Sequence, residues 1–309
     1  MGDVLGKPGK VPQKFPMLKL PENPKMGVVR SMESEDQVTF SYCSNATRKL
    51  IKKLNVNTNL FMVNIGPPLS IDTSFNDASV TREVFLNSSP TPEADFNIHL
   101  KHLLSILNRS QINDLHFNWA CESYNVVEFC RILSEIWVWN LYISADITNV
   151  IFLQILNSNI HPYRLMLEKN PFTDGDLIQK VLVRNYGEIH LYPTTSPKLD
   201  DLLVCNSASI HIYNSILTGR DLNKFLKAWR NGANPSLRYL SISVRGMLIE
   251  DVVMKGIKFE RIPEETSRTF LNQREFKGGL DVKRADGTKG TVILDVSEVL
   301  SYFEFYVWG

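Results

Sequence analysis

The sequence predicts an α/β protein with three parts: a small N-terminal unit of three helices, a middle of alternating strands and helices, and a β-rich C-terminal end. Three observations lead to this prediction. A short apolar strand pattern returns six times between residues 112 and 244, each time near a helix-like stretch. Residues 15–54 place capping residues ahead of short apolar stripes. Residues 246–309 contain a tight-turn pair and end on an aromatic run that is typical of strands.

The repeated strands share an apolar–variable–apolar core of three residues. These cores begin at positions 115, 141, 165, 189, 210 and 240, so the steps are 26, 24, 24, 21 and 30 residues. This spacing is close to the period of leucine-rich repeats, which is about 20–29 residues. Short strands joined by helices form a parallel sheet with right-handed crossovers. Residues 96–245 are therefore predicted to form an irregular leucine-rich-repeat-like α/β solenoid.

Alternation within each strand predicts which side chains point away from the helices. Successive side chains of a strand point to opposite faces, so the two apolar residues of each core face the helices and the middle residue faces outward. Surfaces of this kind on repeat proteins bind partners. The predicted substrate-binding residues are these middle residues: His116, Tyr142, Met166, His190, His211 and Ser241.

The segments around the repeat have different predicted roles. Residues 1–14 are rich in Gly, Pro and Lys, which predicts a disordered tail. Residues 15–54 are predicted to form three helices. A unit this small cannot bury all its apolar side chains internally, which indicates a partner site. Residues 55–95 are predicted to be a connecting β-rich segment. Residues 246–309 are predicted to form a β-rich cap, because the ends of a solenoid must be covered.

Composition and charge argue against several classes of protein. The chain has 309 residues, of which 43% are hydrophobic and 22% charged, as in ordinary globular proteins. A net charge of +1 supplies no basic field for nucleic acid. No secretory leader and no apolar run of membrane-spanning length are evident, so we expect a cytoplasmic or nuclear protein that binds no membrane. The four cysteines form no CxxC pair and are expected to be reduced, buried thiols.

No catalytic or metal-binding motif is evident. We find no nucleophile elbow, P-loop, HExxH or dinucleotide-binding pattern, so the chain is not expected to be an enzyme or to hold a cofactor. His116, His190 and His211 occupy equivalent strand positions, but Tyr142 and Met166 separate the first from the other two. Since the histidine pattern shows no third ligand, no metal site is expected.

Four stretches of the sequence resemble those of a known family. FPMLKLP at 15–21 and FSYCSNATRKLIKKL at 40–54 resemble an F-box. The pattern LxxWxxGxNPxLxxLxI at 226–242, followed by DxKRxDGxxxTV at 281–292, is similar to the type 2 F-box-associated domain family that is expanded in nematodes. Together the resemblance covers about residues 15–295, with 15–54 as the F-box.

The resemblance implies a function. An F-box docks the Skp-type adaptor of a cullin–RING ubiquitin ligase, and the associated domain recruits an unknown protein substrate. The alternative is an interaction scaffold that works without a ligase, in which a degenerate F-box serves as a cap. The resemblance places adaptor contact on seven residues: Leu18, Leu20, Pro21, Val28, Val29, Phe40 and Leu50.

Overall fold

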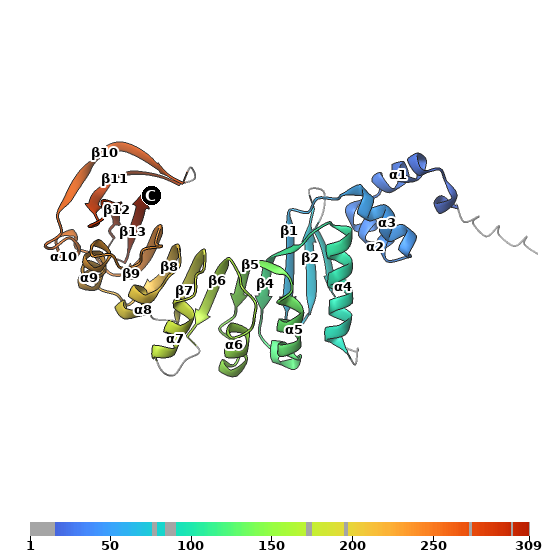
Figure 1. The fold of residues 1–309 in the computed structure, drawn as a ribbon, viewed down its shortest axis with the longest axis horizontal. Coiled ribbons are helices and arrows are strands. Elements are labelled where there is room, and N and C mark those ends of the chain that lie inside the picture. Colours follow the sequence, from blue (N-terminus) through green and yellow to red (C-terminus); the bar gives the residue numbers. More distant parts are fainter. Residues whose placement is uncertain are drawn as a thin grey trace, which may run out of the picture.

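The computed structural model describes residues 16–75, 79–83, 91–170, 175–194, 197–271, 274–297 and 299–308. Within these ranges the chain forms one thirteen-stranded mixed sheet, and helices lie in a row along one side of it (Figure 1). The strand order is β10-β11-β12-β13-β9-β8-β7-β6-β5-β4-β1-β2-β3. The predicted tail, residues 1–14, lies outside the described residues.

Three short α-helices precede the sheet and lie beside one end of it (Figure 1). Ser44 and Thr47 form a reciprocal capping box at the start of the third helix, which satisfies backbone donors that have no partner within the helix. That helix ends where Asn55 adopts a left-handed conformation with φ of 51°. The elements are a 3₁₀ turn η1 (Met17–Lys19), α1 (Glu22–Arg30), α2 (Ser34–Ser41) and α3 (Asn45–Leu54).

Six parallel strands form the middle of the sheet. The apolar pairs predicted to face the helices are buried, as Leu115 and Phe117 show with exposures of 0%. The strands are β4 (Gln111–Phe117), β5 (Trp137–Ile143), β6 (Arg164–Lys169), β7 (Glu188–Thr194), β8 (Ser209–Ser215) and β9 (Tyr239–Arg245). The helices are α4 (Pro92–Ile106), α5 (Val126–Leu133), α6 (Asn149–Leu156), α7 (Gly175–Leu182), α8 (Leu199–Val204) and α9 (Gly219–Arg230), with the turn η2 (Cys121–Ser123).

Further strands extend both edges of the parallel set. On one edge, β1 (Leu60–Ile65) pairs in parallel with β4, and β2 (Ser70–Ser74) and β3 (Ser79–Glu83) continue in antiparallel order. On the other edge, β13 (Leu300–Trp308) pairs antiparallel with β9. Beyond it lie β12 (Lys289–Asp295), β11 (Arg274–Lys283) and β10 (Phe259–Phe270), and the short α10 (Glu250–Val253) connects β9 to β10.

The fold class predicted from the sequence is wrong. It divided the chain into a three-helix F-box, a leucine-rich-repeat-like solenoid and a separate cap, whereas strands from residues 60–83 and 259–308 belong to the same sheet as the central strands. The physical reason for the single sheet lies at the two edges of the set of central strands. β4 and β9 would each expose a row of backbone N–H and C=O groups, and pairing with β1 and β13 satisfies those groups. The result is an α/β fold dominated by a single sheet.

The C-terminal strands are joined to the parallel strands by packing on both faces. On the helix side, Trp229 of α9 is fully buried and meets the ring of Phe305 edge-on at 4.8 Å between centroids. Gly290 of β12 makes room for this contact, because a methyl group there would overlap the Phe305 ring. On the opposite face, Tyr239, Phe270 and Tyr306 form a second, smaller core. The two cores fix the position of the C-terminal strands.

Helix α4 connects the N-terminal helices to the sheet. Ser41 of α2 lies with its Oγ 2.7 Å from Nε2 of His102 on α4, and the neighbouring Tyr42 ring stacks on the same imidazole at 3.9 Å. Asn108 donates from its side chain to the carbonyl of Lys52, 3.1 Å away, at the end of α3. These contacts hold the helical unit in one orientation. No helix within the described ranges is long and apolar enough to cross a membrane.

His102 makes the stability of this joint depend on pH. Burial, aided by the charges of Arg48 and His99, lowers the pKa of His102 to about 4 from an ordinary value of 6.5. The unfolded chain therefore takes up a proton at higher pH than the folded chain does, and stability is lost as pH falls from 6.5 towards 4. Between pH 7 and pH 5 the expected loss from this residue is about 2 kcal/mol. Chemical denaturation of the wild type and of His102→Gln at both pH values measures it, and an equal pH dependence in the two proteins would contradict the prediction.

Candidate functional site

The face of the sheet opposite the helices carries a continuous row of side chains, which we call the central row. Backbone register places one residue of each strand directly beside the next across eight strands. All six residues that the sequence predicts for substrate binding lie in it, in neighbouring positions. The central row consists of Asn64, His116, Tyr142, Met166, His190, His211, Ser241 and Glu304.

Rings in the central row stack in pairs. His116 and Tyr142 lie with centroids 4.1 Å apart and planes tilted by 6°, and His190 and His211 lie 4.2 Å apart with a tilt of 7°. Neighbouring strands are separated by about 4.8 Å, so rings at matched positions meet face to face. The stacks give this face flat aromatic patches.

A second row runs beside the central row and consists of charged and polar groups that bind one another. Nδ2 of Asn140 donates to Asp114 at 2.5 Å, and a guanidinium nitrogen of Arg164 donates to Oε2 of Glu188 at 2.6 Å. Each pair joins two adjacent strands. The hydrogen bonds therefore hold the polar groups of this row in fixed positions.

Glu188 is the centre of the densest network on this face. Its Oε1 accepts from Nε2 of His190 at 2.6 Å and lies 3.1 Å from Nε2 of His211. Burial by itself opposes ionisation of Glu188, but the hydrogen bonds from the two imidazoles and from Arg164 outweigh it, so its pKa lies well below the usual range. Burial also lowers the pKa of His190, although the bond to Glu188 counteracts this. At neutral pH the site is therefore an ionised Glu188 carboxylate that accepts a hydrogen bond from a neutral His190 imidazole.

Tyr213 completes the network from the neighbouring strand. Its hydroxyl lies 2.8 Å from Nδ1 of His190, and its ring stacks on that of Tyr192 at 4.9 Å. Because the ionised carboxylate of Glu188 only accepts, Nε2 of His190 carries the proton and Nδ1 accepts from Tyr213. Both ring nitrogens of His190 are thus engaged.

Strand alternation in the sequence predicts that the two histidines lie on the open face, flanked there by Glu188, Arg164 and Tyr213, but it does not predict the contacts among them. Glu188 and His190 are two residues apart on β7, so alternation alone places both on the open face. The pattern therefore put a third ligand-type group beside the two histidines, although no third ligand was expected from the sequence. The contacts of Arg164 and Tyr213 depend instead on the register between strands, which no local pattern reveals.

The seven residues predicted for adaptor contact fall into two groups. Val29 and Leu50 are buried, with exposures of 0% and 9%, and Val29 belongs to the main core. Leu18, by contrast, is 45% exposed. The accessible group consists of the exposed Leu18 and Pro21 and the half-buried Leu20, Val28 and Phe40.

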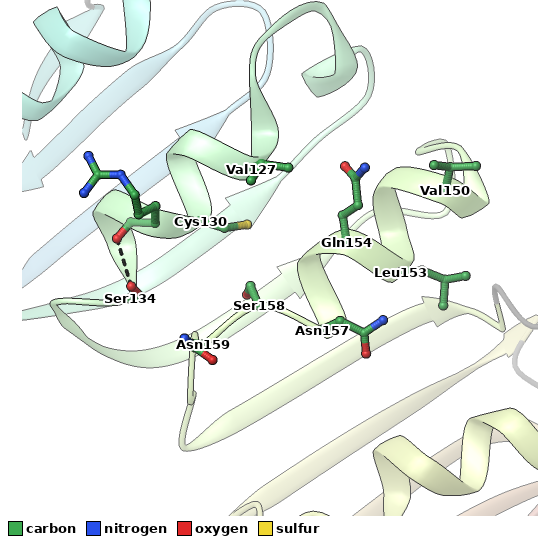
Figure 2. Close-up of a pocket in the computed structure, with 10 residues that line it drawn as sticks. Val127, Cys130, Ser134, Val150, Leu153, Gln154, Asn157, Ser158 and Asn159 are labelled. Carbon is green, nitrogen blue, oxygen red and sulfur yellow. Dashed lines mark hydrogen bonds between the residues drawn. The ribbon is translucent and has the colours of Figure 1, made fainter.

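A groove on the helix side lies between α5 and α6 (Figure 2). It has a volume of about 590 Å³, and Val127 and Val150 at its rim are 59% and 66% exposed. Cys130 also lines it, but burial raises the pKa of this thiol to about 11, so the thiolate that nucleophilic chemistry requires is scarce at neutral pH. The groove offers an apolar surface rather than a reactive centre.

Comparison with known proteins finds a family match in the C-terminal half of the parallel strands. Residues 177–242 match the family described as F-box associated. The F-box associated domain-containing protein sdz-33 of Caenorhabditis elegans is 28% identical over 115 residues, which cover 37% of this chain and 36% of that protein. The uncharacterised protein F59B2.8 of the same organism is 21% identical to this chain. The alignment covers 95% of this chain and 78% of F59B2.8. No solved structure matches the chain.

Glu188 is expected to contribute strongly to stability. Glu188→Ala would leave the buried N–H groups of His190 and Arg164 without their acceptor, which costs about 3 kcal/mol of unfolding free energy. Urea denaturation at neutral pH measures the change. The exposed Glu122 provides the matched control, since Glu122→Ala should change stability by less than about 0.5 kcal/mol. Similar losses of unfolding free energy in the two variants would show that the Glu188 network does not contribute to stability.

Proposed function

We propose, because the chain belongs to the F-box associated family, that it is a substrate-recognition subunit of an SCF-type cullin–RING ubiquitin ligase. In this proposal the N-terminal helices dock a Skp-type adaptor and the open face of the sheet binds a protein substrate. The family match covers residues 177–242, so the docking role of residues 16–54 rests on the structure of that segment. The observation that carries the docking role is an accessible apolar surface on the N-terminal helices.

The helical unit has the surface that docking requires. Leu18 is 45% exposed, and Leu20, Val28 and Phe40 remain partly accessible although the core is close by. Apolar side chains left open on a unit of this size are typical of partner sites. These side chains come from η1, α1, α2 and the turn after η1, so a partner would contact several elements at once.

The joint between the two proposed surfaces supports a bridging role. The contacts of α4 with α2 and α3 hold the helices against the sheet. Arg109 adds to them, since its guanidinium donates to Asn113 at 2.6 Å and to the carbonyl of Thr58 in the connection to β1. A fixed separation raises the effective concentration of a bound substrate near the ubiquitin-charged enzyme. In this role the chain supplies geometry and needs no catalytic residues.

The open face supports the substrate-binding role. Its central row and second row combine Tyr, His, Met and Arg side chains, and Tyr and Arg are enriched among the residues that dominate binding energy. Hydrogen bonds such as that between Arg164 and Glu188 hold the side chains in place, so binding costs less ordering entropy. We place this activity in the cytoplasm or nucleus, as the sequence predicts.

A second candidate is a scaffold that acts without a ligase. The burial of Val29 and Leu50, together with the contact between Ser41 and His102, favours it, because residues that resemble adaptor contacts belong to the protein's own core. In that case the helices serve as a cap for the end of the sheet. The two candidates differ in whether the exposed side chains bind an adaptor.

Leu18→Asp tests the adaptor role. A charge at this exposed position should weaken co-purification with a Skp-type adaptor at least tenfold, a loss of about 1.4 kcal/mol or more, and leave the melting temperature unchanged. Val150→Asp, which alters a more exposed apolar residue on α6, should leave adaptor binding intact. If the wild type binds no adaptor, the ligase role is wrong. In the scaffold alternative, removal of residues 16–54 would destabilise the sheet.

Substrate recognition is tested by the paired variant Tyr142→Ala with Met166→Ala. Both side chains are half-buried on the open face, so their loss should cost little stability but remove contact area in the middle of the central row. Proteins that co-purify with the wild type should be lost, while the adaptor should be retained. Retention of the same partners by the paired variant would show that the substrate binds elsewhere.

A further inference from the structure

We propose that Glu188, His190 and His211 form a binding site for one divalent zinc-type ion. The proposal does not rest on the function proposed above, because it concerns three side chains and their immediate partners. The sequence analysis expected no metal site, since the histidines by themselves showed no third ligand. The structure places the carboxylate of Glu188 between them.

The three groups converge from two adjacent strands. His190 and His211 are register partners on β7 and β8, and Glu188 is two residues before His190 on the same face. One ligand-type atom from each lies within 4.8 Å of the other two. The convergence follows from parallel pairing, which sets the two imidazoles side by side and turns the same nitrogen, Nε2, of both towards one carboxylate oxygen.

The donor set suits zinc. Two imidazole nitrogens and one carboxylate oxygen are ligands that Zn²⁺ accepts, and three protein ligands leave a fourth position open. The side chains of His190, His211 and Glu188 are 10%, 18% and 15% exposed, so the site is shielded but reachable from the open face. The open position would point towards that face, where water or a donor atom of a partner would fill it.

The surrounding groups are arranged as the outer contacts of metal sites usually are. In the metal-free form Nε2 of His190 donates to Glu188 and Nδ1 accepts from the Tyr213 hydroxyl at 2.8 Å. When an ion binds Nε2, the single ring proton moves to Nδ1, which then donates to the Tyr213 oxygen. A hydroxyl both donates and accepts, so Tyr213 satisfies either state. Such contacts orient a ligating imidazole and fix its tautomer.

Arg164 and Ser209 define the other contacts of the site. Arg164 holds Oε2 of Glu188 at 2.6 Å, which leaves Oε1 as a single-oxygen ligand. Its positive charge reduces attraction for a cation, but the carboxylate that it pairs with offsets that charge. The Ser209 Oγ lies 3.2 Å from Nε2 of His211, and the ion would replace this hydrogen bond.

Binding requires a modest rearrangement of the two rings. They now stack with centroids 4.2 Å apart and planes tilted by 7°, so their nitrogen lone pairs run parallel instead of meeting at a point. Zinc–nitrogen bonds of about 2.0–2.1 Å require the two Nε2 atoms to lie within about 4 Å and to face the same ion. Rotation of the side chains provides this, and the ion replaces the hydrogen bonds that now join the imidazoles to Glu188.

The test is titration of the full chain with Zn²⁺ by calorimetry and with Co²⁺ by visible absorption, at pH 7.5. We expect one ion per chain with Kd on the order of 1 μM or tighter. Glu188→Gln and His211→Gln should each weaken binding at least 100-fold, and Tyr213→Phe should weaken it about tenfold, as loss of an outer contact does. Melting curves without metal establish that each variant is folded.

His116→Gln is the matched control. His116 occupies the equivalent position on β4 and stacks on Tyr142 in the same way that His190 stacks on His211, but Tyr142 is not a zinc-type ligand. This variant should bind zinc as the wild type does. The proposal is overturned if the wild type shows no saturable binding, if His116→Gln weakens binding as much as His211→Gln does, or if Co²⁺ shows thiolate coordination.

Discussion

The continuous backbone hydrogen-bond ladder of the sheet is the constraint on which the rest of this structure depends. Six parallel strands would leave β4 and β9 as open edges, and the chain closes both by adding strands from outside the repeating region. Parallel pairing at β1 and antiparallel pairing at β13 convert what looked like separate segments into one sheet. Every functional feature of the open face then follows from how neighbouring strands are aligned.

The register between neighbouring strands brings residues that are far apart in the sequence together on one face of the sheet. His190 and His211 come from different strand–helix units, yet the ladder sets them directly beside each other, and it does the same for His116 and Tyr142. The same alignment places Arg164 beside Glu188 on the adjacent strand. Buried charge is tolerated here because each charged group has partners, and the resulting network holds polar side chains in fixed positions.

The apolar side chains of the N-terminal helical segment divide between the core and the surface. Val29 and Leu50 pack within the protein, while Leu18 is exposed. The contact of α2 with His102 places a neutral, buried imidazole at the junction. If the helices dock an adaptor as proposed, this joint would give the adaptor a fixed orientation relative to the sheet, which a flexible linker would not.

Local patterns in the sequence determined the central strands and the orientation of their side chains. The apolar–variable–apolar cores predicted the six central strands, and two-residue alternation predicted which side chains lie on the open face, because both depend only on nearest neighbours along the chain. Tertiary structure alone decided how the strands at each edge join, why Val29 is inside, and that Arg164 and Tyr213 complete the cluster around Glu188. Those outcomes depend on strand register and on contacts between residues far apart in the chain, and the free energy of such pairing is a property of the whole sheet and not of any one segment.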